Sequence, residues 1–60
     1  MTIEEYIEKG KQLIADWEWA YVCQDSVLMD KLTKERQKIE MEIIEIGNDF
    51  ACKYFEEIYN

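Results

Sequence analysis

The sequence predicts an all-α fold, either a helical hairpin or a short three-helix bundle, that assembles into a dimeric helical bundle. The chain has 60 residues with no proline and only two glycines, so little interrupts long helices. Good helix formers dominate, and the apolar residues recur at helical spacing. A single domain of this size, residues 1–60, buries only about 60% of the surface that its unfolded chain exposes. Association with another chain is therefore expected to complete its core.

The first helix is expected at about residues 3–24. Thr2 and Glu5 have the spacing of a capping box. Gly10 costs helix stability, and its expected use is to let another backbone approach closely. The apolar residues fall in pairs seven positions apart, which is typical of helices that pack lengthwise. These pairs are Tyr6/Ile7, Leu13/Ile14, Ala20/Tyr21 and Val27/Leu28.

The second helix is expected at about residues 26–46, and two positions for the turn before it remain open. The polar residues Gln24, Asp25 and Ser26 include good N-caps. The alternative is a turn at about residues 30–33 with Thr33 as the cap, and the apolar repeat that continues to residues 27 and 28 supports it. We favour the first position, because one continuous helical stripe follows it. This stripe consists of Leu28, Leu32, Ile39, Ile43, Ile46 and Phe50.

A third helix is expected at about residues 49–59. Gly47 suits the end of a helix, and Asn48 or Asp49 suits the start of the next one. The alternative is a second helix that is kinked at Gly47 and continues to the end of this segment.

A second apolar stripe on each half of the chain is the main indication of function. A two-helix hairpin buries one stripe per helix, so the second stripes need another cover. Either they pack inside a three-helix monomer, or they form the interface with a second copy or another protein. The eight aromatic residues favour an interface. The interface residues predicted from these stripes are Trp19, Val22, Met29, Met41, Ile44, Phe55 and Tyr59.

The charge distribution disfavours direct binding to nucleic acid or to an anionic membrane. The chain carries 14 acidic and 7 basic residues, a net charge of −7. Residues 31–38 form a basic waist, in which Lys34, Arg36 and Lys38 are candidate polar contacts. The alternative for the waist is a solvated helix face. A nucleic-acid-linked role remains a second hypothesis, either RNA binding through the waist or mimicry of nucleic acid by the acidic ends.

Catalysis, a metal site and a cofactor are not expected. The chain has no histidine, one serine and two cysteines, without a nucleophile–base pair or the spacing of a zinc site. Cys23 and Cys52 are expected to be buried and unpaired. The first residues lack the features of a signal peptide, and no apolar run approaches the ~20 residues that span a bilayer. We therefore expect a cytoplasmic protein.

The function that these features predict is a small protein–protein interaction module. It is expected to form a homo-oligomer, with a dimer favoured, and to regulate or inhibit a larger protein. Short helical hairpins with surplus apolar faces occur among plasmid and phage accessory proteins, including small dimeric RNA-binding hairpins. This analogy of shape suggests a phage or mobile-element product, although a fold does not fix a function.

Overall fold

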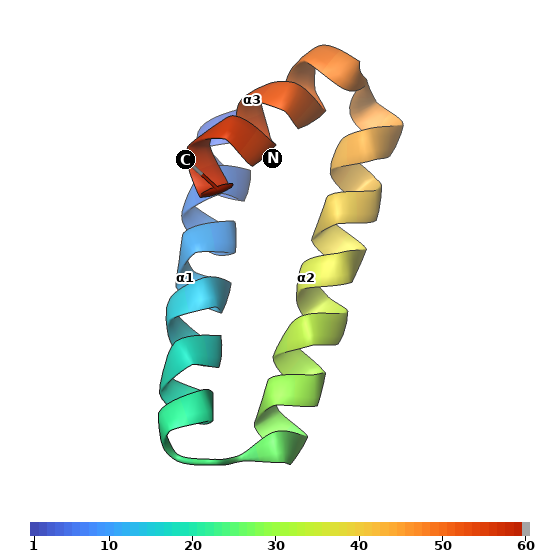
Figure 1. Ribbon diagram of the computed structural model, residues 1–60. Helices are drawn as coiled ribbons and strands as arrows, with labels where there is room; N and C mark the ends of the chain where they lie inside the picture. The colour runs from blue at the N-terminus through green and yellow to red at the C-terminus, as the bar shows by residue number, and fades with distance from the viewer. Residues whose placement is uncertain (60) are drawn as a thin grey trace.

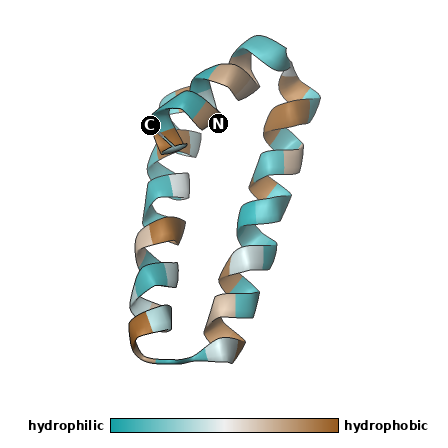
Figure 2. Cartoon of the chain, in the orientation of Figure 1, coloured by the Kyte–Doolittle hydropathy of each residue, from teal (hydrophilic) through white to brown (hydrophobic). Residues whose placement is uncertain are grey.

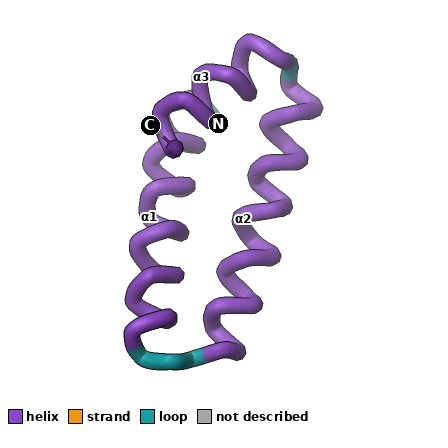
Figure 3. Tube along the Cα trace, in the orientation of Figure 1, coloured by secondary structure: helices purple, strands orange, loops and turns teal. Residues whose placement is uncertain are grey.

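The computed structural model describes residues 1–59, which form three α-helices and no strand (Figures 1 and 3). The helices are α1 (Ile3–Val22), α2 (Ser26–Ile46) and α3 (Asn48–Tyr59). The prediction of an all-helical chain is confirmed, and of the two architectures considered the three-helix bundle is the one observed. Within residues 1–59, no helix has the length and apolar character needed to cross a membrane.

The start of α1 is held by the capping box that the sequence predicts. The Thr2 hydroxyl accepts a hydrogen bond from the Glu5 N–H at 3.3 Å. In return, the Glu5 carboxylate accepts one from the Thr2 N–H at 3.5 Å. Two N–H groups that the helix itself leaves without partners are thereby satisfied, which stabilises the helix end by about 1 kcal/mol.

The turn between α1 and α2 occupies residues 23–25, the first of the two positions considered. It has the paired hydrogen bonds of a Schellman motif. The Asp25 N–H donates to the Ala20 carbonyl at 2.9 Å, and the Gln24 N–H donates to the Tyr21 carbonyl at 3.0 Å. Gln24 adopts a positive φ of 57° within it. The Asp25 carboxylate then accepts a hydrogen bond from the Leu28 N–H at 3.1 Å and caps α2. Leu28 therefore belongs to the second helix, and the apolar repeat of α1 stops before it.

Gly47 separates α2 from α3, so the two are not one kinked helix. Its φ of 152° and ψ of 163° lie in a region that only glycine adopts without strain. The Gly47 carbonyl accepts a hydrogen bond from the Ala51 N–H at 3.0 Å, which begins the third helix. The chain turns at this point, and α3 folds back from the end of α2 toward the N-terminal half of α1 (Figure 1).

The core lies where α3 covers the α1/α2 hairpin. All three helices contact one another, and the two largest fully buried side chains are Ile43 from α2 and Tyr54 from α3. Burying a side chain of this size contributes about 1.5–3 kcal/mol. Hydrophobic residues recur along every helix, with hydrophilic ones between them (Figure 2). The buried core consists of Tyr6, Leu13, Ala20, Leu32, Ile39, Ile43 and Tyr54.

The third helix covers about half of the hairpin. With 12 residues, α3 is about 18 Å long, whereas the long axis of the molecule measures 36 Å. Its last residue, Tyr59, contacts α2 at Arg36 and Glu40. The end of the hairpin beside the turn is therefore built from two helices without a third.

Candidate protein-binding surfaces

Large apolar side chains are exposed around the turn end of the hairpin. Trp19 is 69% exposed and Val22 is 72% exposed, although both belong to a regular helix. Exposure of this size is unusual for tryptophan, which is strongly buried on average. We call this part of the hairpin the aromatic end, and its exposed apolar residues, which lie on more than one side of it, are Trp17, Trp19, Tyr21, Val22 and Val27.

Part of the aromatic end comes from the stripe that the sequence assigns to the core. Trp17 and Tyr21 lie one turn apart, and their rings stack with centroids 5.6 Å apart and planes at 16°. Tyr21 and Val27 were expected to pack against another helix, but both are exposed. The reason is the length and placement of α3, which ends at the level of Arg36 and leaves this part of the hairpin uncovered.

The charged residues in the segment that contains the aromatic end are all acidic. Residues 12–30 contain four carboxylates and no lysine or arginine. The last turn of α1 also lacks a basic residue that would offset the negative end of its helix dipole. An apolar partner surface that carries cations fits this environment, because an arginine guanidinium also binds the face of an exposed tryptophan ring. The four carboxylates belong to Asp16, Glu18, Asp25 and Asp30.

A second exposed apolar surface lies on α2. Met41 is 64% exposed and Ile44 is 58% exposed, three positions apart on one helix. Ile43 between them is fully buried, so the two exposed side chains lie on the side of α2 that faces away from the core. This surface belongs to a different helix from Trp19 and Val22. The chain therefore offers two separate apolar faces.

The other three predicted interface residues pack within the chain or bond to it. Met29 and Phe55 are partly buried and pack against the core. The ring of Phe55 lies edge-on to Tyr54 with centroids 5.4 Å apart and stacks on Tyr59 at 5.9 Å. Tyr59 is 49% exposed, but its hydroxyl is hydrogen-bonded to α2. The structure thus leaves Trp19 and Val22 on one helix and Met41 and Ile44 on another as the most exposed members of the predicted set.

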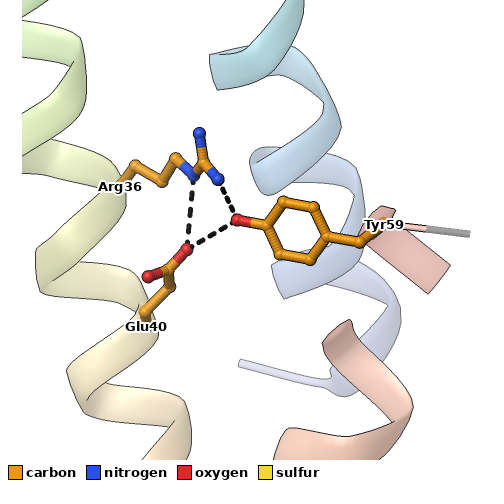
Figure 4. Close-up of polar contacts among 3 residues, drawn as sticks. All are labelled: Arg36, Glu40 and Tyr59. Carbon is orange, nitrogen blue, oxygen red and sulfur yellow. Dashed lines mark hydrogen bonds and ion pairs between the residues drawn. The ribbon is translucent and has the colours of Figure 1, made fainter. Parts of the chain in front are cut away.

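Arg36, Glu40 and Tyr59 form a polar cluster that fastens the end of α3 to α2 (Figure 4). The Arg36 Nε donates to the Glu40 carboxylate at 3.3 Å, and the Tyr59 hydroxyl donates to the same oxygen at 2.9 Å. Arg36 also donates to the Tyr59 hydroxyl, and its guanidinium carbon lies 5.1 Å from the ring centroid. Burial raises the pKa of Tyr59, and Glu40 adds to this while Arg36 opposes it. The sequence indicated the Arg36–Glu40 pair, but no local signal pointed to Tyr59.

The basic waist is therefore not a uniform cationic patch. Arg36 is engaged by Glu40 and Tyr59, as described above. Lys34 pairs with Asp30 at 3.1 Å, and both side chains are largely exposed, at 75% and 68%. Such a surface pair contributes less than about 1 kcal/mol, so it exchanges readily for another partner. Lys38 is exposed as well.

A shallow hollow between α1 and α2 is smaller than a typical small-molecule site. Its volume of about 240 Å³ lies below the ~300–1,000 Å³ of typical ligand pockets. The Tyr6 hydroxyl donates to the Glu42 carboxylate at 3.3 Å at this hollow. Burial raises the pKa of Tyr6, and the negative charge of Glu42 raises it further. The lining residues are Met1, Tyr6, Lys9, Glu35, Lys38, Ile39 and Glu42.

The two cysteines differ from expectation in one respect. Cys23 and Cys52 are free, but both are exposed rather than buried. Cys23 caps the C-terminal end of α1 beside the turn, where two helices alone cannot enclose it. In residues 1–59, no group of three or more potential metal ligands comes together.

Comparison with known protein families, with curated proteins and with solved structures finds no match to this chain.

Proposed function

We propose that this protein is a protein–protein interaction module that forms a dimer and regulates or inhibits a larger protein, of the kind that phages and other mobile elements encode. The observation that carries the proposal is the exposure of Trp19, at 69%, within a chain whose three helices already enclose a core. Tryptophan and tyrosine are the residues most enriched at binding hot spots. The aromatic end places two tryptophans and a tyrosine within the last six residues of α1, with Trp17 and Tyr21 stacked on one side of the helix and Trp19 on the other.

The presence of two separate apolar faces supports two simultaneous contacts. The aromatic end lies at the turn, whereas Met41 and Ile44 lie on the outer side of α2. A second copy on one face leaves the other free for the larger protein. The aromatic end is the better site for a foreign partner, because a second copy would place its own four carboxylates against those of the first.

The pairing of the waist residues favours this proposal over a nucleic-acid-linked role. Arg36 and Lys34 both have carboxylate partners within the chain, and Arg36 is also bonded to Tyr59. The aromatic residues of the chain's turn end lie among carboxylates, whereas single-stranded nucleic acid binds where aromatic rings lie among cations. We expect no binding of a single-stranded RNA probe at low salt, measured by fluorescence anisotropy.

The first test is the mass of the protein in solution. Light scattering on a sizing column, with reductant present, is expected to give the mass of two chains. Trp19→Ser and Met41→Ser each remove one exposed apolar side chain and should leave the helical circular-dichroism signal unchanged. One of these variants should lose the dimer while the other keeps it. A wild-type monomer at every concentration would refute self-association, and dimers in both variants would place the interface away from these two faces.

A further inference from the structure

One face of α2 carries a continuous row of exposed residues at the spacing of a coiled-coil seam. The spacings alternate between four and three, so all members project from the same side of the helix. The row lies away from Leu32, Ile39 and Ile43, which α2 contributes to the core. We call this row the α2 seam, and it consists of Lys31, Lys34, Lys38, Met41 and Glu45, each of which is exposed.

The charges along α2 change sign halfway. Residues 26–38 contain four cations and two carboxylates, whereas residues 39–46 contain three carboxylates and no cation. This order opposes the helix dipole, which favours acidic residues near the start and basic residues near the end. Accordingly, the first turn of α2 has no acidic residue and the last turn has no basic one. The arrangement thus disfavours the isolated helix, although it is complementary to the same helix running in the opposite direction.

We propose that a second copy of the chain packs antiparallel along the α2 seam. This inference rests on the self-association proposed above and specifies its surface, orientation and register. With the symmetry axis between Ile39 and Glu40, Lys34 of each copy faces Glu45 of the other. In the same register, the alkyl stem of Lys38 lies over Met41 of the second copy. The seam thereby gives the basic waist a role that does not require nucleic acid.

The antiparallel orientation follows from the charges. A parallel pair would set Lys34 against Lys34 and Lys38 against Lys38 of the second copy, and like charges across an interface are strongly disfavoured. The only intrachain competitor that the structure gives for Lys34 within residues 1–59 is Asp30, in a weak exposed pair. The antiparallel dimer also leaves both aromatic ends free and places them at opposite ends of the α2 pair. It would therefore offer a larger protein two identical binding sites.

Reciprocal charge reversal tests the seam. In Lys34→Glu, the new carboxylate faces Glu45 of the second copy twice in each dimer, and in Glu45→Lys two lysines face each other twice. Each variant alone should dissociate at least about tenfold more readily than the wild type in sedimentation equilibrium. In a heterodimer of the two variants, the introduced carboxylate faces the introduced lysine, and the retained Lys34 of one copy faces the retained Glu45 of the other. An equimolar mixture should therefore regain the wild-type dissociation constant.

The matched control is Glu8→Lys, which makes the same change in net charge at an exposed position on α1. It should dimerise like the wild type. Weakening by Glu8→Lys equal to that by Glu45→Lys, or a mixture that stays monomeric, would overturn the seam. A wild-type dimer unaffected by either reversal would also overturn it, while self-association through another surface would stand. A wild-type monomer would overturn both proposals.

Discussion

At the scale of single residues, Gly10 decides how closely α3 approaches α1. A Cβ atom at this position would lie 2.9 Å from the Ile58 Cδ1 and would clash with the Tyr54 hydroxyl. Real Cβ atoms do not approach other atoms so closely. Tyr54 is only 1% exposed, so its ring has no free space into which it can move. The helical cost of glycine is thus offset by the contact that it permits between two helices.

The substitution Gly10→Ala is expected to destabilise the fold. Alanine gains up to ~1 kcal/mol in helix propensity, but overpacking against a buried tyrosine costs about 1–3 kcal/mol. We expect a net loss of about 1 kcal/mol in the free energy of unfolding, measured by urea denaturation. Lys11→Ala, at the adjacent exposed position, should change it by less than about 0.5 kcal/mol. A Gly10→Ala variant more stable than the wild type would show that α3 does not pack on α1 in this way.

At the scale of elements, short-range hydrogen bonds set the ends of the helices. Thr2 caps α1, Asp25 caps α2, and Gly47 ends α2 before α3 begins. The turn after α1 is the exception, because the left-handed position of its Schellman motif holds Gln24 rather than glycine. A residue with a Cβ atom is strained there by about 1–2 kcal/mol.

The substitution Gln24→Gly is expected to stabilise the hairpin. Glycine removes the strain of the positive φ, and part of this gain is offset because glycine makes the unfolded chain more flexible. We expect an increase of about 0.5–1 kcal/mol in the free energy of unfolding, seen as a higher midpoint in thermal denaturation. Gln12→Gly, within α1, is the matched control and should destabilise by about 1 kcal/mol. Equal effects of the two glycines would contradict the turn geometry.

At the scale of the whole molecule, three tyrosines connect the helices. Tyr6 on α1 donates to Glu42 on α2, and Tyr59 on α3 donates to Glu40 on α2. Tyr54 on α3 lies in the core between them. Burial raises the pKa of all three phenols above the ordinary value of 10.0, and nearby glutamates raise it further. The folded chain therefore holds these protons more tightly than the unfolded chain does.

This difference predicts a loss of stability at alkaline pH. A pKa that is higher in the folded state stabilises the fold at pH values below the unfolded value of about 10, and the contribution is lost as the pH rises through the folded value. The thermal midpoint should therefore fall as the pH rises from about 9 to about 11. Tyr6→Phe removes one of the three groups and should make this fall shallower. A midpoint that does not change over this interval would contradict the proposed hydrogen bonds between the helices.

The candidate surfaces could be predicted only in part. The second apolar stripes seen in the sequence include four residues that are exposed in the structure, namely Trp19, Val22, Met41 and Ile44. Helical periodicity identifies the residues that share one side of a helix, because residues three and four positions apart project in the same direction. It placed Phe55 on the same kind of stripe, but it could not show that the fold of α3 packs Phe55 against the core.

The sequence by itself determined the helical character of the chain and the capping box that begins its first helix, because capping and side-chain spacing act over three to six residues. It left two positions open for the first turn and two outcomes at Gly47, and the structure decided both. Only the tertiary structure decided which apolar side chains stay exposed. That outcome depends on where α3 folds back, through contacts such as Tyr59 with Arg36, 23 positions away. The same placement exposes Tyr21, which its periodicity had assigned to the core. Local pattern cannot specify such contacts, because they depend on the length of α3 and on the close approach at Gly10.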